Sequence, residues 1–469
     1  MEALCGGVFA ACPVHMVITI DENGQVKRRT VRNISHKGDA GYSANDLVDS
    51  DDFPTRWGTA AKMATIITSA PVGAQAATLD IEKAYRTIPI KPEDKKFLVV
   101  AHRNSFWLDH VAPFGLATAS GLQGEVADAT MDIWTNVGVG PSEKWVDDVT
   151  IFRFPISSQF DSLGILIHTY AYDREGAKSL IAALQVPWHP SKGQEFDDVV
   201  LYVGFSWDIP AKTVQIADHK LARLIQKIDT FITSFERRSV PLKEVQRING
   251  SLNHAAFVYP HGRAYLTSLA SFITEFEHMP TNRALQRYAK SSMWSDLRWW
   301  LNELRLGPRV QSLAPPGPCS SLDIWVDAST DWGVGIVIDS RCTGWRWLPG
   351  WNASRSGNIG WGEAIAVELA VLQVERAGTH NASILVHSDN QGVIGAFQRG
   401  RSRNWLVNQC IRRTVLLCTE RNLSIVFLYV ESAVNLADPI SRGEWVPSFL
   451  AIADVVPLPE ALRTFLVHV

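Results

Sequence analysis

Acidic residues stand at the ends of apolar, strand-like segments at four places along this chain. They are Asp80 in 78–85, Asp147 and Asp148 in 145–150, Asp327 in 324–329, and Asp389 in 386–390. A carboxylate at the end of a buried strand is costly unless a cation or a hydrogen bond neutralises it. The strands must therefore fold so that these acids meet such partners. Two sets, far apart in the sequence, predict two metal sites.

A proline-rich segment separates the two sets. Its centre is Ala314 to Pro318, within 307–321, and its composition is typical of a linker. A chain of 469 residues is expected to form two or more domains. The predicted divisions are a mixed α+β region at 1–217, a helical region at 218–306, the linker at 307–321, an α/β domain at 322–445 and a tail at 446–469.

Local patterns predict the main elements of these regions. A turn signal at Asp21 to Gly24 predicts a hairpin over 19–34. Apolar and helical periodicities predict the other elements, which are strands at 77–85, 144–152, 199–207, 213–216 and 383–388 and a helix at 116–134. From residue 218 to 306 the pattern is helical, with Leu221, Leu224, Ile228 and Phe231 on one face.

Charge and cysteine content bear on the expected binding partners and on the redox compartment. The formal net charge is −3, but 220–310 carries 14 Lys and Arg against 7 Asp and Glu, a local balance of +7. That stretch is suited to a phosphate backbone, or is simply a solvated helical surface. Six cysteines without paired metal spacing favour a reduced intracellular protein. No signal peptide or membrane-spanning run is expected.

The first acidic set has the form that nucleotidyl transfer requires, because two metal ions must activate the attacking 3′ oxygen and hold the triphosphate. Here the chain resembles a reverse transcriptase. The resembling stretches are 27–35 with Lys27 and Arg29, Asp80 with Ala84 and Tyr85, Pro113 to Leu116 with Phe114 and Gly115, Asp147 with Asp148, His189 to Gly193 with Lys192, 202–205 and 242–254. The resemblance implies a right-hand polymerase of fingers, palm and thumb.

The resemblance also implies roles for individual residues. Metal ligands would be Asp80, Ile81, Asp147 and Asp148, and substrate would contact Lys27, Arg29, Tyr85, Phe114, Gly115 and Lys192. Lys27 and Arg29 alternate along one strand face and could clamp phosphates, or are merely exposed basic residues. Tyr85 could exclude a 2′ hydroxyl or be a core aromatic, and Lys192 could protonate pyrophosphate or be a plain loop lysine.

The chain departs from the family pattern at three points. Trp145 stands where a tyrosine usually precedes the aspartate pair, and Ser120 stands where a proline is frequent. The segment before Thr19 is short for a complete fingers region. We expect the tryptophan to alter primer placement more than metal binding, and the short start raises the prospect of a truncated or repurposed copy.

The second acidic set resembles that of a ribonuclease H domain, most closely in DIRS-type retroelements. Supporting stretches are 296–300, 344–345, 359–363 and 435–442. The implied fold is a mixed sheet flanked by helices, with four carboxylates holding two metals. Asp438 is the fourth candidate, or else a residue that starts a helix.

The third carboxylate is a choice between Glu363 and Glu368. At about 100° per residue, Glu363 shares an arc with Ala366, Val367 and other apolar residues, whereas Glu368 falls about 140° away. This predicts that Glu363 faces the sheet as a metal ligand and that Glu368 is solvated.

Together these features predict an RNA-directed DNA polymerase with ribonuclease H activity, from a retrotransposon. The expected cofactor is Mg²⁺, two per site, with Mn²⁺ as an alternative. Expected partners are an RNA template, an RNA–DNA hybrid, a DNA primer and dNTPs, and no membrane. The alternatives are a host-adopted enzyme and a non-catalytic RNA-binding scaffold of the same fold. The sequence leaves the oligomeric state and the priming mechanism open.

Overall fold

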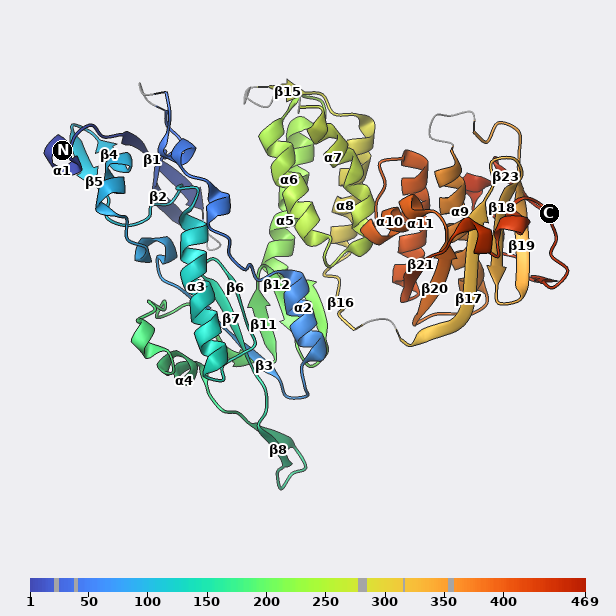
Figure 1. Cartoon of the computed structure of the whole chain (residues 1–469), viewed down its shortest axis with the longest axis horizontal. Helices are drawn as coiled ribbons and strands as arrows, with labels where there is room; N and C mark the ends of the chain where they lie inside the picture. Colours follow the sequence, from blue (N-terminus) through green and yellow to red (C-terminus); the bar gives the residue numbers. More distant parts are fainter. Residues whose placement is uncertain (21–24, 38–40, 277–284, 315–316, 353–357) are drawn as a thin grey trace. The chain divides into compact units, whose positions relative to one another are not determined.

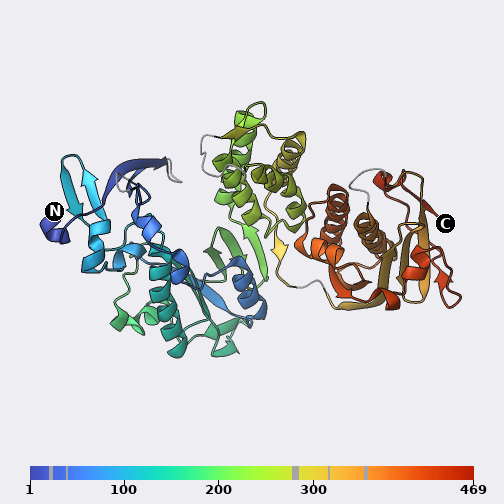
Figure 2. The ribbon, with the colours of Figure 1, turned by 45° about the horizontal axis from the view of Figure 1, so that its top comes forward.

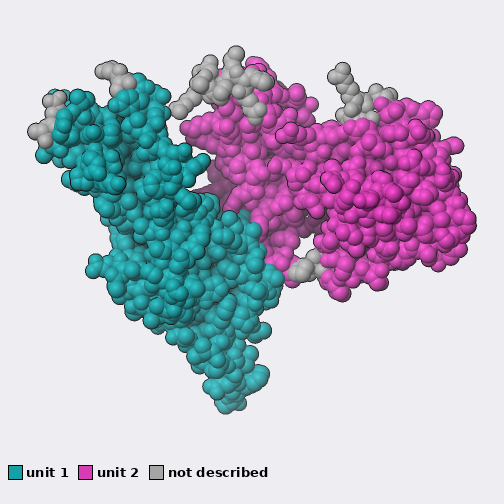
Figure 3. Space-filling view, in the orientation of Figure 1, with its two compact units in different colours: residues 1–213 teal, residues 214–469 magenta. Residues whose placement is uncertain are grey.

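The computed structural model describes residues 1–20, 25–37, 41–276, 285–314, 317–352 and 358–469. It is a mixed α/β structure with several sheets and helices. The chain divides into two compact units, Met1–Thr213 and Val214–Val469 (Figure 3). This division lies well before the proline-rich segment, so the helical region groups with the C-terminal sheet.

Unit 1 is built from short strands and a few helices. Its helices are α1 (Glu2–Cys5), α2 (Ala60–Ser69), α3 (Ala119–Asn136) and α4 (Arg174–Ser179). Its strands are β1 (Ala11–Ile20), β2 (Val26–Arg32), β3 (Gln75–Asp80), β4 (Val99–His102), β5 (Ser105–Leu108), β6 (Ser142–Trp145), β7 (Asp148–Arg153), β8 (Ser157–Phe160), β9 (Leu166–Thr169), β10 (Gln194–Asp197), β11 (Val199–Tyr202) and β12 (Phe205–Asp208).

Two four-stranded sheets organise unit 1, in the orders β2-β1-β4-β5 and β10-β3-β7-β6. The predicted hairpin near the start is confirmed as β1 paired antiparallel with β2, although its turn, 21–24, lies outside the described residues. The second sheet packs on α3 through a core that includes Leu79, Val149, Ile151 and Trp134. This packing fixes the ends of β3 and β7, where the first acidic set lies.

Unit 2 begins with a bundle of helices. Its helices are α5 (Asp218–Phe235), α6 (Leu242–Ala255), α7 (Thr267–Thr274), α8 (Ser291–Arg305), α9 (Ile359–Arg376), α10 (Gln391–Arg399), α11 (Trp405–Glu420) and α12 (Asp438–Ser441). The first four, green to olive, lie together in both views (Figures 1 and 2). The helical period predicted for α5 is confirmed, because Leu221, Leu224, Ile228 and Phe231 are its buried residues.

The rest of unit 2 is a mixed sheet with helices on both faces. The strands after β13 (Thr213–Ile216), on the boundary between units, are β14 (Val240–Pro241), β15 (Gln286–Arg287), β16 (Gln311–Ser312), β17 (Cys319–Ala328), β18 (Gly333–Ile338), β19 (Arg341–Trp347), β20 (Ala382–Ser388), β21 (Leu423–Tyr429), β22 (Leu450–Ala451) and β23 (Leu466–His468). The strand order in the mixed sheet is β21-β20-β17-β18-β19-β22, and β23 also pairs with β19, whereas β14 pairs with β15 and β16 is not part of this sheet. β17, β20 and β21 are parallel, whereas β17, β18 and β19 are antiparallel.

Successive residues of β18 face opposite sides of this sheet. Ile336 belongs to the core shared with α9, whereas Val337 packs with Ile440 of α12. At Gly335 a β-carbon would lie 2.6 Å from the Ser441 nitrogen, so only glycine allows α12 to approach this closely. This contact brings α12 beside the acid that ends β17.

The segment 446–469, predicted to be a tail, is part of this sheet, since it contributes β22 and β23. Strands of two or three residues are too short for an alternating pattern to predict. No helix within the described residues combines the length and the hydropathy needed to cross a membrane.

Candidate active sites

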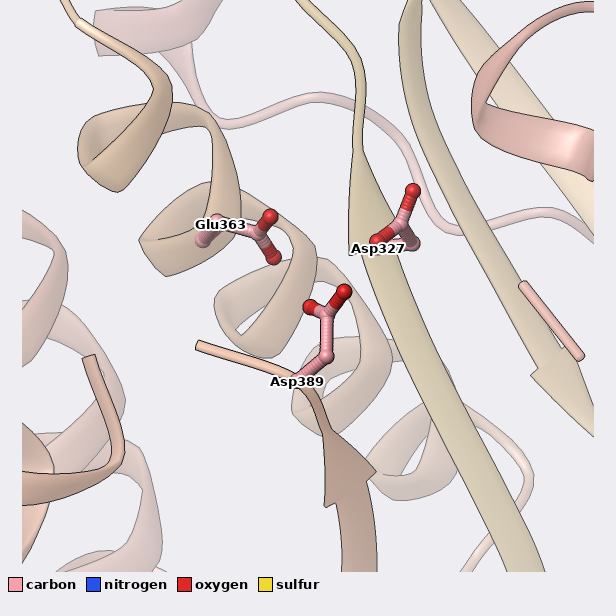
Figure 4. A group of neighbouring side chains, drawn as sticks. All are labelled: Asp327, Glu363 and Asp389. Atoms are coloured by element: carbon pink, nitrogen blue, oxygen red, sulfur yellow. The ribbon is translucent and has the colours of Figure 1, made fainter. Parts of the chain in front are cut away.

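Three acids of unit 2 converge at one edge of the mixed sheet. Asp327 lies near the end of β17 and Asp389 directly follows β20. The two strands are parallel and Trp325 pairs with His387, so the acids two residues further on are neighbours. Glu363 approaches from α9 (Figure 4). One ligand atom from each acid lies within 4.8 Å of the others, which is the arrangement predicted for these three residues.

The cluster is electrostatically unfavourable without a cation. Burial, together with the nearby Asp389 and Asp438 charges, raises the pKa of Asp327 to about 7, against a hydrogen bond from Ser441 that lowers it. Burial, and then the Asp327 and Asp389 charges, raise the pKa of Glu363 to about 9. Glu363 Oε2 is buried and has no hydrogen-bond partner in the described structure. Carboxylate oxygens that repel one another and include one without a hydrogen-bond partner fit a hard divalent cation such as Mg²⁺ or Mn²⁺.

Hydrogen-bond donors orient two of the three acids. Ser441 Oγ donates to Asp327 Oδ2 at 2.5 Å, and Asn435 Nδ2 donates to Asp327 Oδ1 at 3.2 Å. Ser432 Oγ donates to Asp389 Oδ2. Sequence reasoning gave these three residues no individual role. Ser441 and Asn435 lie in the stretch 435–442 that carried the resemblance, which was the available signal.

Asp438 lies at the margin of this group. It is not one of the three acids whose ligand atoms converge. Its carboxylate is held by Arg442, with Nη2 at 2.9 Å from Oδ1. Its charge nevertheless contributes to the raised pKa of both Asp327 and Glu363. Asp438 is therefore close enough for its charge to act on the cluster, but its carboxylate is paired with the Arg442 guanidinium.

The prediction that Glu368 is solvated is wrong. Its exposed fraction is 1%, and its two carboxylate oxygens accept hydrogen bonds from Arg413 at 2.5 and 2.8 Å. The cause is the position of α9, which packs against both the sheet and α11. The side of α9 that carries Glu368 therefore faces another helix instead of water.

We expect Glu368→Gln to lower the free energy of unfolding by about 1–3 kcal/mol, because it leaves the Arg413 charge without its bidentate partner. The matched control is Glu375→Gln on the same helix. Its partner Arg421, at 2.7 Å, is half exposed, so the expected loss is under about 1 kcal/mol. Urea unfolding of both variants measures the difference, and equal losses would contradict the role of burial.

The raised pKa values also predict how stability depends on pH. The pKa values of Asp327 and Glu363, about 7 and about 9, lie above the roughly 4 of unfolded carboxyls. The contribution of these two carboxyls to the free energy of unfolding is therefore fully present below about pH 4 and is lost as the pH rises through 7 and 9. The melting temperature in EDTA should fall as the pH rises to about 9, and Mg²⁺ should raise the melting temperature more at pH 8 than at pH 6. An Asp327→Asn, Glu363→Gln variant should lose most of the slope; an unchanged slope would contradict the assignment.

The first acidic set lies at the tip of a hairpin in unit 1. Asp80 ends β3 and is paired in register with Asp148, the first residue of β7. Asp147 lies in the two-residue turn between β6 and β7. Its neighbour Val146 has φ 58, an unusual conformation for a β-branched residue. Such outliers persist where the surrounding structure enforces them, often at functional sites.

Lys192 supplies a positive charge to this set. Its Nζ lies 2.9 Å from Asp80 Oδ2 and 3.1 Å from Oδ1, and Asp80 is 7% exposed. The hydrogen bond to Asp80, and then the charges of Asp80, Asp147 and Asp148, raise the pKa of Lys192. Among the described residues these three aspartates do not converge as tightly as the unit 2 acids.

The other predicted residues of this site lie around the turn. The Ile81 amide donates to the Asp147 carbonyl at 2.9 Å, which joins the two acidic segments. The rings of Tyr85 and Phe114 meet edge to face at 5.1 Å. Burial, and then the Asp147 charge, raise the pKa of Tyr85, so its ring lies near that carboxylate. Gly115 has φ 98, a conformation that favours glycine.

Three further sequence features have different outcomes. The side chains of Lys27 and Arg29 lie outside the described residues, although their backbones pair with Thr19 and Val17 in the β1–β2 hairpin. Trp145 is 46% exposed and its ring lies 5.4 Å from that of Trp57. The expected effect of Trp145 on primer placement stays a prediction. Ser120 lies within α3.

Comparison with known proteins finds similarity only among solved structures. No protein-family model matches this chain, and no curated protein matches it. A foamy viral protease-reverse transcriptase dRH in complex with double-stranded DNA is 15% identical, with a TM-score of 0.41 over 90% of this chain and 65% of that chain. A foamy viral protease-reverse transcriptase in complex with an RNA/DNA hybrid is also 15% identical, with a TM-score of 0.43 over 95% of this chain and 53% of that chain.

A further complex of the foamy viral protein with double-stranded DNA gives 15% identity and a TM-score of 0.40, over 90% of this chain and 78% of that chain. The chain thus spans less than two thirds of the length of the first two neighbours. These similarities do not support the DIRS-type assignment, and no family follows from them.

Proposed function

We propose that this chain is an RNA-directed DNA polymerase with a separate ribonuclease H site that cleaves RNA in an RNA–DNA hybrid. The observation that carries the proposal is the trio of Asp327, Glu363 and Asp389, of which Asp327 and Glu363 are buried, with an unpaired Glu363 oxygen among the described residues. Two carboxylates at the ends of neighbouring strands and a third from a helix, converging on one point, are suited to two-metal phosphodiester chemistry. Mg²⁺ is the proposed ion for both sites.

In the hydrolytic site, bound cations would activate water and stabilise the leaving oxygen. Asp327, Glu363 and Asp389 would hold them. Ser441 and Asn435 keep the Asp327 carboxylate in one orientation, since they donate to different oxygens. Asp438 would be a fourth ligand only after release from Arg442, which now neutralises it.

In the polymerising site, the proposed ligands are Asp80, Asp147, Asp148 and Ile81. Lys192 Nζ would leave Asp80 when cations bind and would then be free to donate a proton to pyrophosphate. Tyr85 and Phe114 would line the nucleotide, with the Tyr85 ring excluding a 2′ hydroxyl. Lys27 and Arg29 are proposed to hold the triphosphate. The proposed arrangement is the fingers, palm and thumb of a right-hand polymerase, with 218–306 as the thumb.

The test uses purified full-length chain and Mg²⁺. Extension of a DNA primer on RNA and DNA templates with dNTPs is expected, together with cleavage of labelled RNA in a hybrid. Nucleic-acid binding without either activity would overturn the proposal in favour of a scaffold. A retrotransposon origin, DIRS-type or other, remains a proposal from sequence resemblance.

A further inference from the structure

A β-hairpin of unit 1, formed by β8 and β9, stands apart from the larger sheets of that unit. Among the described residues the two strands form a two-stranded sheet of their own. Figure 1 shows β8 at the bottom of the view, where the hairpin extends away from the rest of unit 1. A two-stranded hairpin is marginally stable in water unless it packs against something else. It therefore needs contacts at its base, a further partner, or both.

Contacts at the base of the hairpin hold it on unit 1. The Tyr170 hydroxyl donates to the Gly73 carbonyl at 2.7 Å, and the Arg153 guanidinium lies 3.9 Å from the Tyr170 ring centre. At Gly73, where φ is 82, a β-carbon would lie 2.5 Å from His168 Nε2, so glycine lets the His168 ring pack closely. The base of the hairpin is therefore fixed, and these contacts leave its outer part, 156–167, uncovered.

The outer part of the hairpin exposes large apolar side chains. Those exposed by 37% to 80% are Ile156, Phe160, Leu163, Ile165, Leu166 and Ile167. Together they expose several hundred Å² of apolar surface, a size at which such a patch usually marks a contact site. The one charged residue of 154–172 is Asp161, whose carboxylate accepts hydrogen bonds from the Leu163 and Ile165 amides at 2.8 Å within the turn. A partner would therefore meet an apolar, nearly uncharged surface.

The edge of β9 is better suited than that of β8 to pair with another strand. An edge strand presents unpaired N–H and C=O groups, and natural proteins usually protect it with lysine, proline or a bulge. β9 has the sequence Leu-Ile-His-Thr and pairs with β8 in an unbroken register, so it has none of these features. β8 is more polar, with the sequence Ser-Ser-Gln-Phe, and Pro155 stands two residues before it. The unprotected edge of the hairpin is therefore β9.

The register of the hairpin determines how two β9 edges can meet. The Asp161 amide donates to the Ile165 carbonyl at 2.9 Å, and backbone direction alternates along a strand, so Ile167 also directs its backbone groups toward β8. Those of Leu166 and His168 point to the free edge. An antiparallel second β9, related by a two-fold axis at Ile167, would hydrogen-bond each Leu166 to the His168 of the other copy. The two Ile167 side chains would then face each other at the closer, non-hydrogen-bonded position.

We propose that two copies of this chain form a dimer by pairing their β9 edges into one four-stranded sheet. In such a two-fold contact the same surface meets itself, and this surface is apolar and carries no charge that would repel its copy. A standard interface buries about 800 Å² on each partner. The hairpin offers less than that, so the dimer should be reversible and dependent on concentration. The proposal concerns assembly and is independent of the proposed enzymatic function.

The first test is analytical ultracentrifugation of the full-length protein over a dilution series, in which the wild type should shift from monomer to dimer as its concentration rises. Ile167→Lys should raise the dimer dissociation constant at least about tenfold, because the two-fold axis brings the two introduced charges face to face. Ile167→Val keeps a β-branched apolar side chain and should dimerise like the wild type. The matched control is Val126→Lys on α3, since Val126 is 56% exposed and lies outside the hairpin.

A second test probes the contact itself. Ile167→Cys should form an intermolecular disulfide on mild oxidation with copper phenanthroline, because residues at a non-hydrogen-bonded position have Cα atoms about 4.5 Å apart, which a disulfide can span. Val126→Cys should crosslink no more than the wild type, whose own cysteines give the background. The proposal is overturned if the wild type stays monomeric, if Ile167→Lys and Val126→Lys weaken the dimer equally, or if a dimer forms in which Ile167→Cys does not crosslink.

Discussion

Glu363→Gln should abolish cleavage of RNA in a hybrid, with a loss of at least about 100-fold, while the same protein still extends primers. The side chain is 4% exposed, and its Oε2 atom is buried without a hydrogen-bond partner among the described residues. Removing its charge takes away a proposed metal ligand in a site where even indirect supports of a ligand are worth 10- to 100-fold. The measurement is gel analysis of a labelled hybrid beside primer extension.

The control for this prediction is Glu368→Gln on the same helix. Its effect should be on unfolding, so cleavage measured well below its melting temperature should stay within a fewfold of the wild type. If Glu368→Gln were inactive under those conditions and Glu363→Gln active, the assignment of the ligand on α9 would be wrong. Restored cleavage by Glu363→Asp would support a ligand role for the carboxylate.

Asp148→Asn and Asp147→Asn should each abolish DNA synthesis, again by at least about 100-fold, and leave hybrid cleavage nearly unchanged. Asp148 faces Asp80 across the β3–β7 pair, and Asp147 lies in the adjoining turn. Both charges act on Lys192, so they share one electrostatic site. Loss of either should remove a proposed ligand of the polymerising cations. The two acidic sets lie in different compact units, so the effects should separate.

Asp132→Asn provides the control in unit 1. This carboxylate on α3 is 60% exposed and its ion pair with Arg56, at 2.7 Å, is of the kind that contributes little. The primer-extension rate of the Asp132→Asn variant should match that of the wild type. Full extension by the Asp147 and Asp148 variants would overturn the polymerase assignment.

Much of the scaffold could be predicted from local pattern. The β1–β2 hairpin followed from its turn residues, and the buried face of α5 followed from its helical period. The convergence of Asp327, Glu363 and Asp389 was also predictable, because parallel strands end at one edge and Glu363 shares the apolar arc of α9. In each case the signal lies within one element or between neighbouring strands.

The sequence alone determined which acids lie at the ends of strands, and which face of α9 carries the proposed metal ligand. Tertiary packing decided what else those acids meet. Glu368 is buried because α11 covers the polar side of α9 and supplies Arg413. Asp80 pairs with Lys192, and Asp438 with Arg442. The approach of α12 over Gly335 brings Ser441 to Asp327. Local periodicity gives a side chain's direction, but its solvation and its partners depend on segments that only the folded chain brings together.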